Sequence, residues 1–318
     1  MATGAQYVLL RPGLLYVTAI RRQPYRYPLT MTQFFSEAAS AEAVNARIGE
    51  NADERVREVM SALVRHLHAF AKEVQLTQSE WEAAIDFLTT AGQLCSAERQ
   101  EFILLSDTLG FSMLVDAINN RRPHAATENT VFGPFHVAGA PEREMGACIT
   151  ADGKGERCLF EGRVLDLEGR PVEGARIDVW SDNADGYYDV QQPDVQQPGI
   201  QPKWNNRGIF TTGADGAYRF VGIKPVSYPI PHDGPVGKML ATLGRHPYRP
   251  AHMHFLITAP GFQKVVTHTF VGDDPYLQSD AVFGVKASLV APYERVADSV
   301  TPWRSTFDFV LIPHAPHA

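Results

Sequence analysis

The feature that most constrains the fold of this chain is a change in hydrophobic period along its length. Residues 31–122 carry apolar side chains at helical spacing, whereas the chain beyond Cys158 consists of short alternating runs bounded by Gly and Pro turns. A run of helices followed by a run of strands is typical of an α+β fold. The sequence therefore predicts an N-terminal helical domain followed by an antiparallel β-sandwich.

The helical region carries recognisable start signals. A first helix is expected over Met31–Arg47, and Thr77 with Glu80 forms a capping-box pattern ahead of a later apolar run. Ser96 is expected to cap the helix that runs from Phe102 to Leu109. An apolar stripe at helical spacing predicts a further amphipathic helix, and its members are Val56, Met60, Leu63, Leu67 and Phe70.

The strand region alternates between short apolar runs and turns. The expected strands are Cys158–Asp166, Ala175–Trp180, Gly216–Val221, Met253–Thr258, Lys264–Val271 and Thr306–Leu311. The connection from Asn183 to Gly208 is rich in Pro and Gln and is too long for a simple hairpin. Loops of that length usually carry function, so we expect this one to lie near a site.

The first thirty residues do not resemble a signal peptide. Arg11 interrupts their apolar stretch, and Arg21 and Arg22 follow it, which reverses the charge order of a signal peptide. We interpret residues 1–30 as a disordered or artefactual extension. The helical domain is then expected over residues 31–126 and the β-sandwich domain over residues 127–318.

Composition excludes several classes of function. The formal net charge is −7 and no long basic run offers a footprint for phosphates, which disfavours nucleic acid. No uninterrupted apolar stretch of about 18 residues occurs, so membrane insertion is not expected. Cys95, Cys148 and Cys158 are too few and too irregularly spaced for a disulfide framework or a Cys-based zinc site. We interpret them as thiols in a reducing cytoplasm.

Two histidines, His252 and His254, define half of a candidate metal site. Side chains two residues apart point to the same face of a strand, with Cα atoms about 6.6 Å apart. A second pair, His66 and His68, lies in a predicted helix, where the two rings diverge and make a poor chelate. The residues alone leave open whether the strand pair binds metal or forms two hydrogen-bonded imidazoles.

The remaining ligands of such a site are less obvious. No Asp or Glu follows the histidines at the spacing expected of a two-histidine, one-carboxylate iron site. Tyrosines instead stand in turns rich in Gly and Pro, at Tyr187, Tyr188 and Tyr228. Tyrosines in such turns also cap the turn or stack on proline, and the pattern does not choose between Tyr187 and Tyr188.

Four motifs in order resemble the intradiol ring-cleavage dioxygenases, non-haem Fe(III) enzymes that open catechols between their two hydroxyl groups. The resemblance extends from Asp53 to the C-terminus. The matching segments are Gly162–Val164, Val179–Asn183 with Gly186–Tyr188, Tyr228–Pro235, and Gly244–Arg245 leading to Arg249–Phe255.

The resemblance implies one Fe(III) per subunit, held by Tyr188, Tyr228, His252 and His254. Phenolates are hard anionic donors that favour the ferric state. Tyr228 corresponds to the tyrosine that leaves the metal and accepts a proton from the substrate. Arg249 would stabilise negative charge on the ring, and the alternative for it is a structural salt bridge.

Substrate choice is implied by the same resemblance. Residues 104–110 and 130–135 look like members that cleave hydroxyquinol to 3-hydroxy-cis,cis-muconate or maleylacetate. Asp107 would accept the third hydroxyl group, and the alternative is that it caps or pairs within its helix. His268 stands where catechol-specific members usually carry glutamine. The substrate-binding residues implied are Leu104, Asp107, Val131, Phe132, Gly133, Ile230, Pro231, Arg249 and His268. Catechol and chlorocatechol remain alternative substrates.

Two other classes of protein remain open at this point. One is a non-catalytic β-sandwich binding module, and the other is a zinc hydrolase built on the same histidines. The family resemblance further implies that the helical domain forms a homodimer, with a phospholipid held at the interface in many members. An aromatic diol or triol and O2 are the expected reactants, in the cytoplasm.

Overall fold

The computed structural model describes residues 34–96, 99–191 and 201–314. The chain divides into two compact units between Trp81 and Glu82. The expected extension over residues 1–30 lies outside the described residues. The boundary expected near residue 126 stays a prediction.

The helices before the sheets are α1 Ser40–Asn45, α2 Glu54–Glu73, α3 Gln78–Gln93, α4 Glu101–Thr108 and α5 Phe111–Asn119. The capping box is confirmed, because Thr77 N donates to Glu80 Oε2 at 2.9 Å and Glu80 N donates to Thr77 Oγ1 at 3.3 Å. None of the helices in the described part of the chain has the length and apolar character that a membrane span requires.

Two expectations about helix starts are wrong. Within its described part, residues 34–47, the helix expected over Met31–Arg47 is observed only as α1, and Ser36 Oγ accepts a hydrogen bond from Ala39 N in the turn that precedes it. Ser96 does not cap α4, whose N-cap residue is Gln100. Ser96 Oγ instead accepts a hydrogen bond from Arg99 N. In both places a local hydroxyl-to-backbone bond competes with helix extension.

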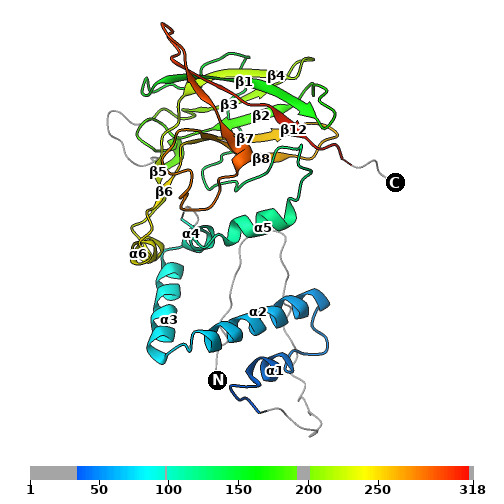
Figure 1. Cartoon of the computed structure of the whole chain (residues 1–318), viewed down its shortest axis with the longest axis vertical. Coiled ribbons are helices and arrows are strands. Elements are labelled where there is room, and N and C mark those ends of the chain that lie inside the picture. The colour runs from blue at the N-terminus through cyan, green and yellow to red at the C-terminus, as the bar shows by residue number, and fades with distance from the viewer. Residues whose placement is uncertain (1–33, 97–98, 192–200, 315–318) are drawn as a thin grey trace, which may run out of the picture. The chain divides into compact units, whose positions relative to one another are not determined.

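Two five-stranded sheets follow (Figure 1). The first has the order β10-β11-β1-β12 with β4 also paired to β1, and the second has the order β3-β2-β7-β8-β9. The strands of the first sheet are β1 Arg157–Asp166, β4 Ala217–Ile223, β10 Tyr293–Arg295, β11 Trp303–Thr306 and β12 Phe309–Leu311. The strands of the second are β2 Arg176–Trp180, β3 Arg207–Thr211, β7 His252–Thr258, β8 Val265–Val271 and β9 Val290–Ala291.

Shorter elements connect these sheets. A two-stranded ladder joins β5 Tyr228–Pro229 to β6 Tyr248–Arg249, and helix α6 covers Pro235–Thr242 between them. Single turns of 3₁₀ helix occur at η1 Asp189–Gln191 and η2 Ala287–Leu289. The sequence pattern gave no signal for β5, β6 or α6, because elements of this length show no hydrophobic period.

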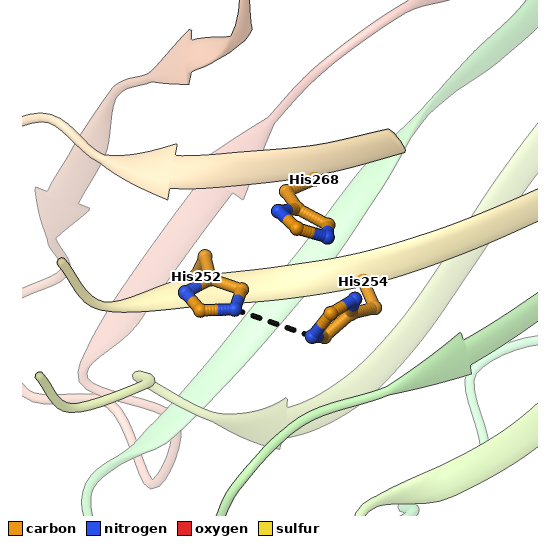
Figure 2. Close-up of side chains that lie close together, drawn as sticks. All are labelled: His252, His254 and His268. Atoms are coloured by element: carbon orange, nitrogen blue, oxygen red, sulfur yellow. Dashed lines mark hydrogen bonds between the residues drawn. The ribbon is translucent and has the colours of Figure 1, made fainter. Parts of the chain in front are cut away.

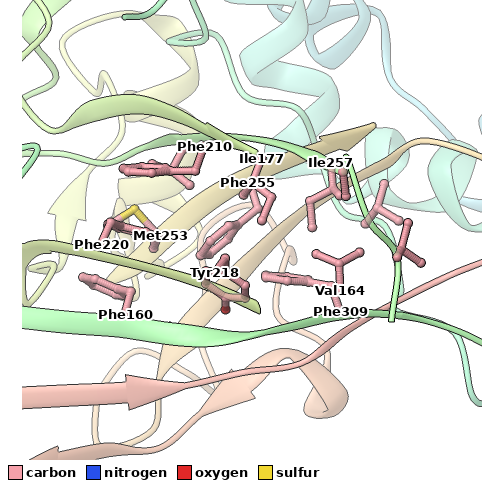
Figure 3. Close-up of a cluster of buried hydrophobic side chains, with 14 of the residues drawn as sticks. Phe160, Val164, Ile177, Phe210, Tyr218, Phe220, Met253, Phe255, Ile257 and Phe309 are labelled. Carbon is pink, nitrogen blue, oxygen red and sulfur yellow. The ribbon is translucent and has the colours of Figure 1, made fainter. Parts of the chain in front are cut away.

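The inner faces of the two sheets share one hydrophobic core. Phe160 of β1 and Phe220 of β4 stack with ring centroids 4.9 Å apart, and Phe255 of β7 packs against them from the other sheet (Figure 3). These side chains are fully buried or nearly so. The α+β fold with a β-sandwich is therefore confirmed, although its sheets are mixed. Strand β1 runs parallel to β11 and β12, since hydrophobic alternation specifies the faces of a strand and not its direction.

Candidate metal centre

Strand β7 fixes the direction of the two strand histidines. Met253 and Phe255 point into the core, so the alternation of side chains turns His252 and His254 to the opposite face of the sheet. Both histidines are only 1% exposed. His268 of β8 stands directly across from His254 in the ladder, and the three rings gather in one buried cluster (Figure 2). The ligand nitrogens of these three residues lie within 4.8 Å of one another, a group that could hold a metal ion.

Two tyrosines complete a set of four donor atoms around the histidine pair. Tyr188 Oη lies 2.9 Å from His254 Nε2, and His254 Nε2 lies 3.2 Å from His252 Nε2. Tyr228 Oη lies 3.5 Å from Tyr188 Oη. Metal–ligand bonds of about 2.0–2.1 Å place neighbouring donors of a tetrahedral site about 3.3 Å apart. The observed spacings fit a metal ion among these four side chains.

The structure separates residues that the sequence left ambiguous. Tyr188 is fully buried at the cluster, whereas the neighbouring Tyr187 is 47% exposed. The second histidine pair does not take part, because His68 Nδ1 instead lies 3.1 Å from Ser40 Oγ. Of the candidate ligands, the fold thus gathers Tyr188, Tyr228, His252 and His254.

The histidine rings are held in orientations that suit a metal. His252 Nδ1 donates to the carbonyl oxygen of Pro250 at 2.6 Å, which leaves Nε2 to face the centre. Trp180, the last residue of β2, stacks on His254 with ring centroids 4.7 Å apart. Gly133 has a φ of 76°, and a Cβ atom there would lie 3.1 Å from His254 Cε1. The glycine predicted at this site is therefore required by both the backbone and the imidazole.

Burial sets the protonation states at the centre. Desolvation lowers the pKa of His252, His254 and His268 well below the usual value, so all three imidazoles are neutral and can offer a lone pair. Desolvation raises the pKa of Tyr188 well above the usual value of a phenol, and it also raises that of Tyr228. A metal cation supplies the positive charge that stabilises the two phenolate forms.

Arg249 adds a fixed positive charge beside the histidines. Its side chain is 4% exposed, Nε donates to Asp280 Oδ1 at 3.2 Å, and Nη1 lies 3.2 Å from His252 Nε2. The two interpretations of Arg249 from the sequence are therefore compatible. The residue forms a buried salt bridge, and that salt bridge aims the guanidinium at the candidate centre.

A cavity of about 670 Å³ borders the centre and contains several of the predicted substrate-binding residues. Asp107, Val131, Phe132 and Gly133 belong to its lining. Gly133 connects the cavity to the centre, because it lies against His254. The cavity is mainly apolar and receives side chains from α4 and α5 as well as from the segment before the first sheet.

Other predicted substrate residues lie outside this lining. Leu104 and Ile230 pack together in a small apolar cluster with Leu240, Ala281 and Val282. Val282, two residues after the Arg249 partner Asp280, packs in this cluster, a contact that the sequence pattern does not indicate. Pro231 is exposed and belongs to neither group.

Asp107 and His268 are two polar groups of the site that can form a further hydrogen bond. Burial raises the pKa of Asp107, while a hydrogen bond from Ser112 and the charge of Arg249 act in the opposite direction. His268 is fully buried, and neither of its ring nitrogens has a well-formed hydrogen bond with a described residue. The backbone of Val131 from the cavity lining faces its ring. Polar groups in this state are suited to receive hydrogen bonds from a ligand.

Family models and sequence relatives identify the family to which this chain belongs. The family model "Catechol dioxygenase N terminus" matches residues 53–127, and the model "Dioxygenase" matches residues 131–313. The hydroxyquinol 1,2-dioxygenase of Rhizobium sp. is 54% identical over 288 residues, which is 87% of this chain and 96% of that protein. The 6-chlorohydroxyquinol 1,2-dioxygenase of Cupriavidus pinatubonensis is 49% identical and covers 88% of this chain and 99% of its own length.

Solved structures agree with these relatives. The hydroxyquinol 1,2-dioxygenase of Pseudomonas putida DLL-E4 superimposes with a TM-score of 0.82 at 48% identity, over 87% of this chain and 99% of that chain. The wild-type catechol 1,2-dioxygenase of Acinetobacter radioresistens gives a TM-score of 0.72 at 29% identity, over 88% of this chain and 93% of that chain. The chain belongs to the intradiol ring-cleavage dioxygenase family.

Proposed function

We propose that the chain holds one Fe(III) per subunit through Tyr188, Tyr228, His252 and His254 and uses O2 to open hydroxyquinol (1,2,4-trihydroxybenzene) between two neighbouring hydroxyl groups. The product of this cleavage is 3-hydroxy-cis,cis-muconate, whose keto form is maleylacetate. One observation carries the proposal. The four donor atoms lie in a buried chain with successive separations of 3.5, 2.9 and 3.2 Å, and two of them are phenols.

The donor set favours ferric iron over zinc. Two phenolates are hard anionic donors and match a trivalent ion, whereas structural and catalytic zinc sites are usually built from His, Cys and carboxylates. Fe(III), when bound, supplies a Lewis acid that draws electron density from a chelated diol and makes its ring reactive toward O2. The neutral histidines add two donors without adding charge.

The side chains around the metal would then accept a proton from the substrate and stabilise negative charge on it. Tyr228 is 4% exposed, and its burial raises the pKa of the phenol, so its phenolate is a strong acceptor for a proton from an incoming hydroxyl group. Arg249, fixed by Asp280, places a guanidinium where negative charge develops on the ring. His268 offers a hydrogen-bonding nitrogen beside both histidine ligands.

Asp107 supports the choice of hydroxyquinol over catechol. A half-buried carboxyl group in a mainly apolar cavity needs a hydrogen-bond donor, and the third hydroxyl group of hydroxyquinol provides one. Catechol has no group at that position and would leave the carboxyl group with its Ser112 hydrogen bond alone. Two relatives, one from Rhizobium and one from Nocardioides simplex, carry the name hydroxyquinol 1,2-dioxygenase and agree with this choice.

The substrate experiment compares kcat/KM for hydroxyquinol and catechol in wild type and Asp107→Ala. We expect the preference for hydroxyquinol to fall by about 10- to 100-fold, because the variant loses only the contact with the third hydroxyl group. Asp116→Ala is the matched control, since Asp116 lines the same cavity but is ion-paired with Lys286. An unchanged preference in Asp107→Ala would contradict the role of Asp107, and a wild type that does not prefer hydroxyquinol would favour catechol or chlorocatechol as the substrate.

The metal experiment is optical. Tyrosinate bound to Fe(III) absorbs visible light, so the iron-loaded protein is expected to be coloured, and Tyr188→Phe is expected to weaken that absorption. A colourless protein that binds zinc at the same residues would favour a hydrolase. A protein that binds neither metal would favour a non-catalytic binding module.

The proposal includes assembly and location. Helix α2 has no buried residue and exposes a continuous apolar stripe, which supports a homodimer formed through the helical region. A phospholipid at that interface is part of the proposal and is tested by mass spectrometry of a lipid extract from the purified protein.

The cysteines Cys95, Cys148 and Cys158 are all free thiols, which supports a cytoplasmic location.

A further inference from the structure

We propose that Arg207 is a positioning residue for Tyr188, because its buried guanidinium anchors the phenol through two different neighbours. The inference rests on the proposed function, in which Tyr188 is an iron ligand. Arg207 is the first residue of β3 and touches none of the four donor side chains in any hydrogen bond among the described residues. Its positive charge helps to lower the pKa of His254, and its hydrogen bonds reach the centre only through neighbouring residues.

The first anchor acts along the chain. Arg207 Nε donates to Asp189 Oδ1 at 2.6 Å, and the two side chains are 1% and 5% exposed. Asp189 directly follows Tyr188, and its Oδ2 accepts a hydrogen bond from Trp204 N at 3.0 Å. Tyr188 N in turn donates to Gln191 Oε1 at 2.7 Å. The backbone that carries the phenol is thus held by a buried ion pair and two further hydrogen bonds.

The second anchor acts across the ring. Arg207 Nη2 donates to the carbonyl oxygen of Phe135 at 2.7 Å. The Phe135 ring stacks on Tyr188 with centroids 4.5 Å apart and an interplanar angle of 25°. One guanidinium therefore fixes both the residue after Tyr188 and the ring that covers one of its faces. The planar fork of arginine suits this double role, which a lysine ammonium cannot reproduce.

The segment before Arg207 carries strain that points to the same role. Trp204 and Asn206 have φ values of 67° and 55°, a conformation that costs free energy for residues other than glycine. Buried amides hold it in place, since Asn205 Oδ1 accepts from Ala151 N at 2.7 Å and Asn206 Nδ2 donates to the carbonyl of Asp182 at 2.9 Å. Strain that is stabilised in this way clusters at functional sites.

Tyr228 is held differently. It lies in the two-residue strand β5, whose ladder partner is β6, and its neighbour Ser227 contacts Asp274. The described contacts of Arg207 all lie on the Tyr188 side. Arg207 therefore fixes the segment that carries Tyr188 and makes no described side-chain hydrogen bond to the segment that carries Tyr228. A change at Arg207 should alter the resting centre more than substrate binding.

The test uses the full-length, iron-loaded protein with Arg207→Gln and Asp189→Asn. Both variants are expected to release iron to a chelator about 10- to 100-fold more readily, as is typical when a residue that orients a metal ligand is lost. Both should also shift or weaken the visible tyrosinate absorption and lower kcat more than they change KM. Arg207→Lys should restore only part of the absorption. Arg170→Gln, which removes a guanidinium that is 70% exposed and paired with Asp166, is the matched control and should change neither readout.

The outcomes separate a positioning role from a purely structural one. If Arg207→Gln lowers the melting temperature but keeps the wild-type absorption and iron retention, the proposal is overturned. Should that variant fail to fold, Asp189→Asn decides, since it keeps the side-chain shape, and an unaltered absorption in it also overturns the proposal. If the wild-type protein itself lacks the tyrosinate absorption, the proposed function fails instead, and that result is visible before any variant is made.

Discussion

The β-sandwich buries its apolar side chains, whereas helix α2 exposes them. In the sandwich, Val164, Phe220 and Leu311 are fully buried between two sheets of the same chain. In α2, no residue is buried, and Leu63, Leu67 and Phe70 are 53%, 59% and 51% exposed. The sandwich therefore completes its core with its own two sheets, whereas the exposed stripe of α2 is the surface to which we assign the proposed homodimer.

This difference separates the part of the chain that positions the candidate ligands from the part that we propose forms the homodimer. The candidate ligands His252 and His254 stand on strand β7, whose other face is locked in the core, and their Nε2 atoms lie 3.2 Å apart. The stripe on α2 extends from Val56 to Phe70 at spacings of three and four residues, which is the pattern of a helix that packs against another helix. We expect the two regions to respond differently to substitution.

The largest expected difference is in folding stability. Phe220→Ala should lower the free energy of unfolding by about 3–5 kcal/mol at every protein concentration, because it leaves a cavity among packed rings. Leu67→Ala should lower it less, and the loss should shrink on dilution, because it is linked to association. Urea unfolding at two protein concentrations measures both effects. If both variants lose the same free energy of unfolding at every protein concentration, the difference between the two regions is contradicted.

The next effect is on assembly. Leu63→Glu places a charge in the middle of the α2 stripe and should raise the dissociation constant of the homodimer at least about tenfold, since a buried charge without a partner is costly. Arg65→Glu, two residues along the same helix and outside the stripe, is the matched control. Light scattering over a dilution series gives the constants. A protein that is monomeric before any substitution would contradict the proposed dimer.

The smallest effect concerns Asp107, a residue of helix α4 that lines the cavity beside the candidate metal centre. Burial raises its pKa above the usual 3.8, so the folded chain binds this proton more tightly than the unfolded chain. The stability of wild type relative to Asp107→Asn should therefore fall as the pH rises through about 4 and should level off above the raised pKa. Paired urea titrations over a pH series measure the difference. A relative stability that grows with pH would show that the carboxylate is favourably paired instead.

Much of this architecture was predictable from local pattern. The strand that carries His252 and His254 was expected to begin one residue later than it does, and its alternation correctly placed both rings on one face. The Thr77 and Glu80 capping box was also confirmed, because it depends on residues three apart. Patterns of this kind are local, and the sequence shows them directly.

The remaining features depend on contacts between distant segments. Nothing local separates Tyr187 from Tyr188, and only the fold shows that Tyr188 meets His254, which is 66 residues away. Arg207 and Val282 gave no signal at all, since one is a common charged residue and the other a common aliphatic one. Arg207 contacts Asp189 and Phe135, and Val282 packs in the cluster of Ile230, and these contacts form only through tertiary structure.

Gly133 has a practical consequence for anyone who wishes to redesign this protein for other aromatic rings. The position combines a left-handed backbone with an imidazole edge 3.1 Å from where a side chain would start. A mutant library that samples this position should return glycine almost alone, while the adjacent Val131 and Phe132 in the same cavity wall should accept a range of sizes. Engineering of the cavity must therefore keep this glycine, whose backbone lies against the candidate ligand His254.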